Sequence, residues 1–352
     1  MASAAALNAR PGERILDLCA APGGKSTQIA GAMQNCGLLI SNDPEPGRAR
    51  ALAGNLERLG AANAIVVNAL PETLAARWPE YFDAILVDAP CSGEGMFRRD
   101  PESRGEWNPA SPAGCAKRQA GILDQAARML RPGGRLVYST CTFNRAENEG
   151  SVQGFLARHP DFAPEEFELP GVGASEEGML RLFPHRLRGD GHFVAKLRRA
   201  GEDRRETIPA PEKVASEVKE CLEMLEREVC ALPDFMLAMH PFMQGGRVAL
   251  APMDAPSTAG IKVVSPGLFL LRAGKNYVEP EHALAMSLPP ECARRRAELT
   301  DQQAAAFLAG EALSLEGEKG WTLALWRGLP LGWGKHAGGI LKNHLPKGLR
   351  RR

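Results

Sequence analysis

The first half of the chain alternates short apolar runs with stretches in which apolar residues recur at helical spacing. Near-continuous apolar runs bounded by Gly, Pro, Asn or Asp are typical of strands in a parallel sheet that is covered on both faces. A spacing of three and four residues predicts amphipathic helices between them. The predicted strands are 14–19, 37–43, 65–68, 82–89 and 135–141, and the predicted helices are 25–33, 48–60, 117–134 and 147–158.

Two further strand signals, at 179–183 and 192–199, follow the last of these helices. The order predicts an α/β fold, a Rossmann-like sheet that finishes in an antiparallel hairpin. The segment 200–211 is charged, contains proline and lacks periodicity, which is typical of a linker. The expected domains are therefore 1–199, then the linker at 200–211, a small α+β region at 212–265 and a β-rich domain at 266–352.

The composition indicates an ordinary soluble protein. The chain has 352 residues, of which 44% are hydrophobic and 24% charged, and no apolar stretch approaches the length of a membrane span. The N-terminus lacks the basic and apolar regions of a signal peptide. Eight cysteines occur without a C-x-x-C pair, and the seven histidines form no metal-like pair. We expect a cytoplasmic protein, without a metal and active as a monomer.

The distribution of charge, and not its total, bears on nucleic-acid binding. The net charge of +1 makes no case for nucleic acid, but residues 321–352 contain seven Lys or Arg and no Asp or Glu. Such a patch attracts phosphates, although a solvated tail is the alternative interpretation.

The stretch LDLCAAPGGKST places glycines at a strand-to-helix turn, where ligands bind in open α/β sheets. A Walker A loop is excluded because Cys19 stands where that motif requires glycine, and a dinucleotide fingerprint is excluded because Gly23 and Gly24 are adjacent. S-adenosylmethionine needs only close backbone approach at the turn, and an acid after the next strand to accept its ribose hydroxyls. Asp43 is that acid. A merely structural glycine turn remains the alternative.

Two cysteines follow predicted strands, Cys91 in VDAPCSGEG and Cys141 in YSTCT. Parallel strands bring their carboxyl ends to one edge, so we expect both thiols beside the cofactor. Two thiols near a methyl donor fit methylation of a pyrimidine at C5, because thiolate addition to C6 makes C5 nucleophilic. We expect Lys25 to assist the thiolate and Asp88 to hold the amino edge of cytosine. Ordinary core cysteines are the alternative.

Three motifs, LDLCAAPGGKSTQIA, FDAILVDAPCSGEGMFRRDP and RPGGRLVYSTCTFNRAENEG, together resemble the bacterial RsmF-type branch of the Nop/Sun RNA cytosine-C5 methyltransferases. The resemblance covers roughly 10–199, and GLPLGWGKHAGGILKNHLPKGLRR is similar to the PUA-like domain that ends many of these proteins. It implies that Cys141 is the nucleophile, that Cys91 assists product release, and that a cytidine of 16S rRNA is the substrate. The implied cofactor contacts are Cys19, Ala20, Ala21, Pro22, Gly23, Gly24, Lys25, Asp43, Asn68 and Asp88.

Two departures from the family pattern bear on these expectations. Asn68 stands where relatives often place an acid that meets adenine, so we expect its amide to serve instead. Relatives also carry a longer segment before the first strand, including a small RNA-contacting part. We therefore expect an N-terminal RNA-binding extension to be missing from this chain.

Basic residues beside aromatic ones are the expected RNA contacts, because they combine phosphate binding with base stacking. The candidates are Arg98, Arg99 and Arg104 beside Trp107, and Lys335, Lys342 and Lys347 with Trp333. A solvated surface loop is the alternative for the first group. Other functions remain open: an RNA-binding ribosome-assembly factor without catalysis, a tRNA methyltransferase, or a DNA cytosine-C5 methyltransferase that would use Cys91 as nucleophile.

Overall fold

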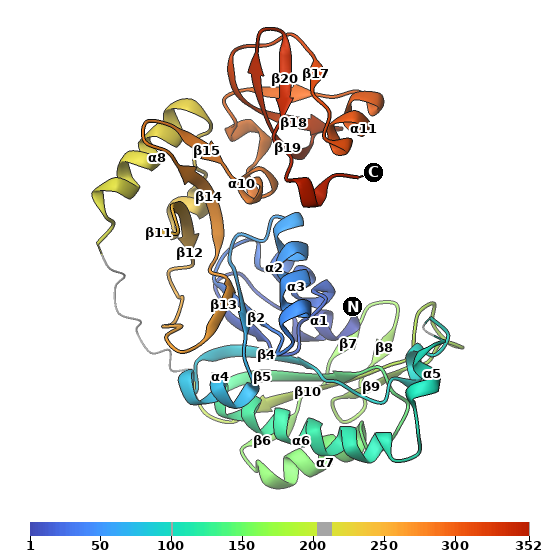
Figure 1. Cartoon of the computed structure of the whole chain (residues 1–352). Coiled ribbons are helices and arrows are strands. Elements are labelled where there is room, and N and C mark those ends of the chain that lie inside the picture. Colours follow the sequence, from blue (N-terminus) through green and yellow to red (C-terminus); the bar gives the residue numbers. More distant parts are fainter. Residues whose placement is uncertain (100, 203–212, 352) are drawn as a thin grey trace. The chain divides into compact units, whose positions relative to one another are not determined.

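The computed structural model describes residues 1–99, 101–202 and 213–351 and divides the chain into two compact units (Figure 1). The linker expected at 200–211 lies almost wholly outside the described residues. No helix in the described parts of the chain is long and apolar enough to cross a membrane. The first unit contains Met1–Asn55, Ile65–Ile208 and Pro256–Val264, and the second contains Leu56–Ala64, Pro209–Ala255 and Ser265–Arg352.

Within the described residues, the first unit is built on a nine-stranded sheet of order β13-β3-β2-β1-β4-β5-β10-β6, with β9 paired to β10. Strand β1 pairs in parallel with β2 and β4, and β4 with β5, whereas β10 runs antiparallel to β5, β6 and β9. The predicted Rossmann-like sheet with its antiparallel hairpin is confirmed. The strand bounds are β1 Arg14–Asp17, β2 Leu38–Asn42, β3 Ala64–Asn68, β4 Phe82–Asp88, β5 Leu130–Thr140, β6 Phe162–Pro164, β9 Met179–Leu182, β10 His192–Arg199 and β13 Lys262–Ser265. A separate pair consists of β7 (Glu168–Leu169) and β8 (Gly173–Ala174).

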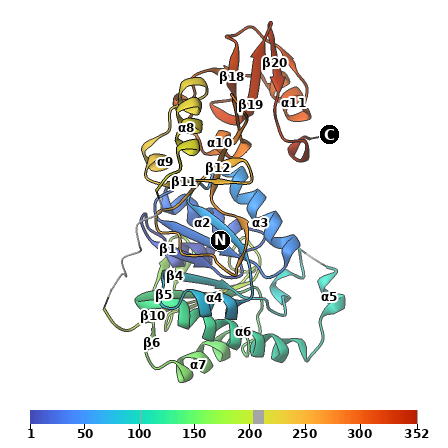
Figure 2. The same ribbon diagram turned by 60° about the vertical axis from the view of Figure 1, so that its left-hand side comes forward.

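Helices cover both faces of this sheet, as its buried central strands require. Figures 1 and 2 show α4, α6 and α7 together on one face and α1 and α2 on the other. The helix bounds are α1 Ala2–Leu7, α2 Gly24–Met33, α3 Pro46–Arg58, η1 Glu94–Met96, α4 Pro71–Arg77, α5 Ser103–Glu106, α6 Ser111–Met129 and α7 Glu149–Arg158. The prediction that the fifth strand follows a helix ending at 134 was wrong in detail, because α6 ends at Met129 and the Pro-Gly-Gly segment already lies in β5.

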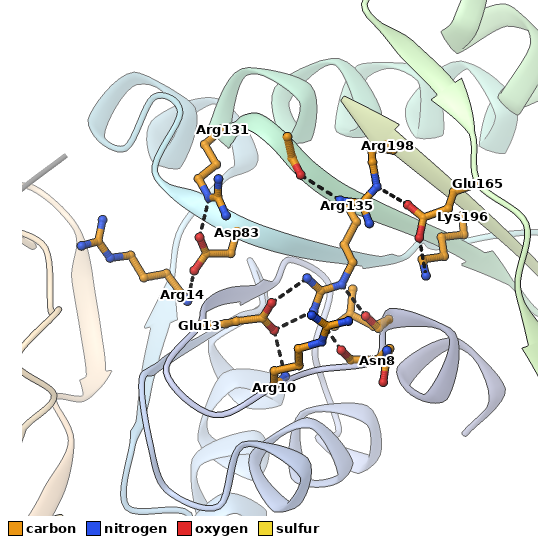
Figure 3. A network of polar contacts seen from close by, with 12 residues as sticks. Asn8, Arg10, Glu13, Arg14, Asp83, Arg131, Arg135, Glu165, Lys196 and Arg198 are labelled. Carbon is orange, nitrogen blue, oxygen red and sulfur yellow. Dashed lines mark hydrogen bonds and ion pairs between the residues drawn. The ribbon is translucent and has the colours of Figure 1, made fainter. Parts of the chain in front are cut away.

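A polar network ties α1 to the edge at which the strands begin (Figure 3). Arg135 of β5 donates to both carboxylate oxygens of Glu13, at 2.7 and 2.6 Å, and to the backbone oxygens of Leu7 and Asn8. Arg131 pairs in the same region with buried Asp83, which also accepts from the Arg14 backbone N–H at 2.6 Å. The guanidinium group of Arg135 thus satisfies two carbonyls at the end of α1, which explains how so short a helix is fixed.

The second unit contains two small sheets and short helices. An antiparallel sheet has the order β11-β12-β14-β15, and a five-stranded sheet has the order β16-β18-β19-β20-β17. The bounds are α8 Ser216–Glu228, α9 Asp234–Leu237, β11 His240–Gln244, β12 Arg247–Ala251, β14 Leu268–Ala273, β15 Val278–Pro280, α10 His282–Ser287, η2 Pro290–Cys292, β16 Arg296–Glu298, α11 Asp301–Ala309, β17 Leu313–Ser314, β18 Gly320–Trp326, β19 Leu329–Ala337, β20 Ile340–Asn343 and η3 Lys347–Leu349.

One expected RNA contact belongs to the core of this unit. Trp333 is only 2% exposed, packs among apolar side chains, and donates its indole N–H to the backbone oxygen of Glu281 at 3.1 Å. The expectation that Trp333 extends an RNA-binding surface was wrong, because an alternating strand places every second side chain inside.

Candidate active site

A cavity of about 540 Å³ lies at the edge where the parallel strands end. Its volume falls within the usual range for sites that bind small molecules and cofactors. Walls come from the turn after β1, the ends of β2, β4 and β5, the start of α4, and α6. The lining residues are Leu18, Cys19, Ala21, Asp43, Pro44, Arg48, Leu70, Pro71, Glu72, Asp88, Ala89, Pro90, Cys91, Lys117, Arg118, Gly121, Ile122 and Cys141.

The glycine turn after β1 is held in place by side chains of α3. Gly23 adopts φ 113° at the start of α2, a conformation that favours glycine, and a Cβ there would lie 3.0 Å from a Leu52 side-chain carbon. Arg48 donates to the backbone oxygen of Ala21 at 2.9 Å, and Asn55 donates to that of Pro22 at 2.8 Å. Of the predicted turn contacts, only Cys19 and Ala21 are among the described residues that line the cavity.

Cys19 faces the cavity as an unreactive thiol. Burial raises its pKa far above the usual value, and the nearby carboxylates of Asp17, Asp88 and Asp43 act in the same direction. Cys19 therefore contributes to the shape of the cavity wall and not to the chemistry.

Asp43 presents a carboxylate at the end of β2 and is 2% exposed. One oxygen accepts the backbone N–H of Glu45 at 3.0 Å, and the other lies 3.4 Å from a nitrogen of Arg48. Asn68 sits behind it, with its amide donating to the backbone oxygen of Asp43 at 2.9 Å. Asn68 is not among the described residues that line the cavity, so its amide positions Asp43 and does not face the cavity itself.

Asp88, at the end of β4, joins several polar groups. Its carboxylate pairs with Lys25 at 2.5 Å and accepts from the Ser139 hydroxyl at 2.7 Å. His192 lies 3.8 Å away, and burial lowers its pKa to about 4, so that imidazole is neutral near pH 7. Lys25 thus supplies a positive charge that faces Asp88.

The sulfur atoms of Cys91 and Cys141 lie 3.2 Å apart, and the Cys141 backbone N–H donates to the Cys91 sulfur at 3.3 Å. The thiol–thiol hydrogen bond is the largest cause of a lowered pKa at Cys141, and the charge of Lys25 lowers that pKa further. The same bond, followed by burial, raises the pKa of Cys91. The pair therefore favours a thiolate at Cys141 with Cys91 as proton donor.

Glu147 fixes the loop that carries Cys91, a role for which no residue was predicted. Its carboxylate is fully buried and accepts the Ser92 backbone N–H and the Gln119 amide, each at 3.0 Å, as well as the Ser92 hydroxyl. Gln119 also donates to the backbone oxygen of Pro90 at 3.0 Å. Both sides of Cys91 are thereby attached to Glu147, shortly after Cys141 in the chain.

The basic residues among the predicted RNA contacts lie on exposed surfaces, in the first unit and in the second. Arg98 and Arg99 are exposed and each lies 3.6 Å from Asp190. The exposed Arg104 lies over the Phe97 ring at 5.9 Å from its centroid. Trp107, expected to stack with bases, donates its indole N–H to Glu94 at 3.1 Å.

In the second unit, Lys335 and Lys342 are paired neighbours on β19 and β20, and both are exposed. Lys335 also lies over the Trp321 ring, at 5.1 Å from its centroid. Lys347 is exposed in η3. The three lysines thus remain available to a ligand.

Comparison with known proteins identifies the family of the chain. Residues 4–198 match the model of the 16S rRNA methyltransferase RsmB/F family. The chain belongs to that family. Residues 226–288 match the first C-terminal domain of RsmF rRNA methyltransferases, and residues 294–351 match the RsmF PUA domain.

Curated relatives extend the similarity along the chain. Ribosomal RNA small subunit methyltransferase F of Shewanella amazonensis is 33% identical over 98% of this chain and 76% of its own length. The protein of the same name from Klebsiella pneumoniae is also 33% identical, over 96% of this chain and 73% of its own. Among solved structures, that of NSun6 from Pyrococcus horikoshii with SFG, an S-adenosylmethionine analogue, has a TM-score of 0.51 at 33% identity, over 57% of this chain and 51% of that one. The protein is an S-adenosylmethionine-dependent RNA methyltransferase with a PUA domain.

Proposed function

We propose that this protein methylates C5 of a cytidine in small-subunit (16S) rRNA, with Cys141 as the nucleophile. The observation that carries the proposal is the pair of sulfurs 3.2 Å apart at the rim of a cofactor-sized cavity. Relatives named for methylation of small-subunit rRNA support the choice of RNA. We further propose that it acts as a monomer in the cytoplasm and needs no metal ion.

The cavity residues fit S-adenosylmethionine. The buried Asp43 carboxylate at the end of β2 is placed to accept ribose hydroxyls. Among the described residues, the oxygen that does not accept from Glu45 has a polar neighbour only in Arg48, at 3.4 Å. Leu70, Pro71 and Ile122 offer apolar surface of the kind that an adenine ring requires. When bound, the cofactor supplies the methyl group that the pyrimidine receives.

Cys141 performs the first covalent step. Its thiolate adds to C6 of cytosine, and the electrons of the C5–C6 double bond move to C5, which becomes nucleophilic. Lys25 and the Cys91 thiol stabilise the thiolate beforehand. Asp88 lies at the same edge, where its carboxylate holds the amino group and favours protonation at N3.

Cys91 assists the release of the product. After C5 has gained a methyl group it still carries a proton. A water molecule of the solvent accepts that proton, and the electrons of the C5–H bond restore the C5–C6 double bond as the C6–sulfur bond breaks. Cys141 then leaves as thiolate. A thiol 3.2 Å from the leaving sulfur is suited to donate a hydrogen bond to it.

The test is transfer of labelled methyl groups from S-adenosylmethionine to in vitro transcribed 16S rRNA, followed by bisulfite mapping of the modified position. The proposal predicts label in 5-methylcytidine. Binding of rRNA without transfer would favour an assembly factor, and label in DNA or only in tRNA would change the substrate class.

A further inference from the structure

The loop between β9 and β10 forms a second, basic hollow on the first unit. It encloses about 380 Å³ and is lined by Arg98, Pro184, His185, Arg186, Leu187, Arg188 and Gly189, a group that we call the arginine pocket. Three arginines and a histidine face this space, and its described lining contains no acidic residue. Such a hollow attracts anions.

Two of these arginines have no internal role. Arg186 and Arg188 are exposed, and neither makes an ion pair or a side-chain hydrogen bond with another described residue. Arg98 differs, because it donates to the backbone oxygen of Gly189 at 3.0 Å and lies 3.6 Å from Asp190. Because neither guanidinium group has a partner among the described residues, both are available to bind an anion from solution.

Backbone contacts tie one end of this loop to the nucleophile. The N–H of Gly95 donates to the backbone oxygen of Cys141 at 2.8 Å, and the N–H of Gly191 donates to that of Gly95 at 3.3 Å. A Cβ on Gly95 would lie 2.6 Å from the Cys141 oxygen and 2.7 Å from the Gly191 oxygen. Only glycine allows this approach, and it keeps the loop close to Cys141.

Aromatic rings tie the other end. Phe183 stacks on Phe143, which lies two residues after Cys141, with ring centroids 5.7 Å apart and planes inclined by 15°. The His185 ring lies 5.4 Å from Phe183. The arginine pocket is therefore held in a fixed relation to the strand end that carries the nucleophile.

We propose that the arginine pocket binds the phosphodiester backbone of the RNA strand beside the target nucleotide. The inference rests on the proposed function, because it places the pocket next to a flipped base. A base that leaves its stack to reach Cys141 draws its flanking backbone toward the protein, and guanidinium groups bind phosphates through paired hydrogen bonds. Arg186 and Arg188 thereby join Arg98 as substrate-positioning residues.

The decisive variant is the double substitution Arg186→Ala/Arg188→Ala, assayed on in vitro transcribed 16S rRNA. A matched control is Arg50→Ala/Arg128→Ala, which removes the same charge from exposed positions on α3 and α6. We expect the KM for RNA to rise about tenfold in the pocket variant, with kcat and cofactor binding unchanged, because each contact contributes ground-state binding to phosphate. The slope of log affinity against log salt should fall by about 1.4, from two lost contacts at about 0.7 each.

Unchanged RNA affinity in the pocket variant, or an equal loss in the control, would overturn the proposal. At constant ionic strength, inorganic phosphate should bind the arginine pocket far more weakly than RNA does, and tighter binding of phosphate than of RNA would assign the pocket to a free anion instead. Failure of the Cys141 chemistry would show as methylation by Cys141→Ala, and it would leave these binding differences untouched. The two proposals therefore fail separately.

Discussion

Cys91 and Cys141 place their sulfur atoms 3.2 Å apart although 50 residues separate them in the chain. The contact exists because β4 and β5 are adjacent parallel strands, and each cysteine follows the end of its strand. One thiol can then stabilise the thiolate of the other.

The pH dependence of methylation should depend on Lys25. Its positive charge lowers the pKa of Cys141, after the larger effect of the Cys91 hydrogen bond. We expect Lys25→Met to raise that pKa, so that the acidic limb of kcat/KM moves to higher pH by about one unit, which corresponds to about 1.4 kcal/mol. Asp88, then unpaired, acts in the same direction.

Lys25→Arg is the matched control, because it retains the charge. His192 stays neutral above about pH 4 and does not contribute to the limb. An acidic limb at the same pH in Lys25→Met and in the unaltered protein would remove Lys25 from the account.

Glu147→Gln should mimic the loss of Cys91. The Ser92 backbone N–H and the Gln119 amide both donate to one oxygen of Glu147, and the Ser92 hydroxyl donates to the other. An amide removes the charge and places an N–H donor opposite one of these donors, so the attachment of the Cys91 loop is weakened. We expect turnover to fall at least about tenfold and covalent protein–RNA adduct to accumulate on denaturing gels, since breaking a buried charged hydrogen-bond network costs about 1.5–3 kcal/mol. Glu168→Gln, an exposed site on β7, is the control. Loss of turnover without adduct would mean that Glu147 acts elsewhere.

Asp43→Ala should weaken cofactor binding by about 10- to 100-fold, as expected for a lost charged hydrogen bond. Isothermal titration with S-adenosylhomocysteine measures the change, and Asp161→Ala provides an acidic control outside the cavity lining. Equal affinity in both variants would assign the ribose to another group.

Asp17 predicts a pH dependence of stability. Burial raises its pKa to about 7, and one of its oxygens has no hydrogen-bond partner among the described residues. An acid whose folded pKa exceeds its unfolded value of about 3.9 contributes most stability below that lower value, and the contribution is lost as pH rises toward 7. We expect Asp17→Asn to abolish this part of the decline in Tm between pH 4 and 8. An unchanged pH profile would contradict it.

Arg135→Ala should lower the free energy of unfolding by about 3 kcal/mol, because it leaves the largely buried Glu13 carboxylate without its partner. Arg198→Ala removes an arginine that is about half exposed from its pair with Glu165, and it should cost less than about 1 kcal/mol. Urea unfolding of the two variants compares their free energies of unfolding. Equal midpoints would show that the contacts of Arg135 with Glu13 and α1 are dispensable.

The sequence predicted what depends on periodicity and on long motifs. Strand order, the glycine turn and the two thiols at one edge follow from apolar runs and from the rule that parallel strands end together. Glu147 escaped prediction because a buried acid in a polar stretch has no distinctive spacing. Arg186 and Arg188 escaped because the shape of the loop between β9 and β10 decides which basic residues share a hollow.

The sequence also could not predict whether a particular side chain lies in the interior or on the surface. Trp333 looked like an RNA contact beside basic residues, yet its strand turns it into the core. Asn68 looked like a cofactor contact, yet its amide is used to hold the Asp43 backbone. Strand alternation decides the first outcome, and a hydrogen bond between residues 25 positions apart decides the second.

The role of the two thiols is tested most directly by comparing Cys141→Ala with Cys91→Ala on 16S rRNA, scoring covalent protein–RNA adduct and labelled 5-methylcytidine together. The account predicts neither adduct nor methylation for Cys141→Ala, and an adduct that forms but is not released for Cys91→Ala. Adduct formation by Cys141→Ala, with none by Cys91→Ala, would contradict the assignment of Cys141 as nucleophile.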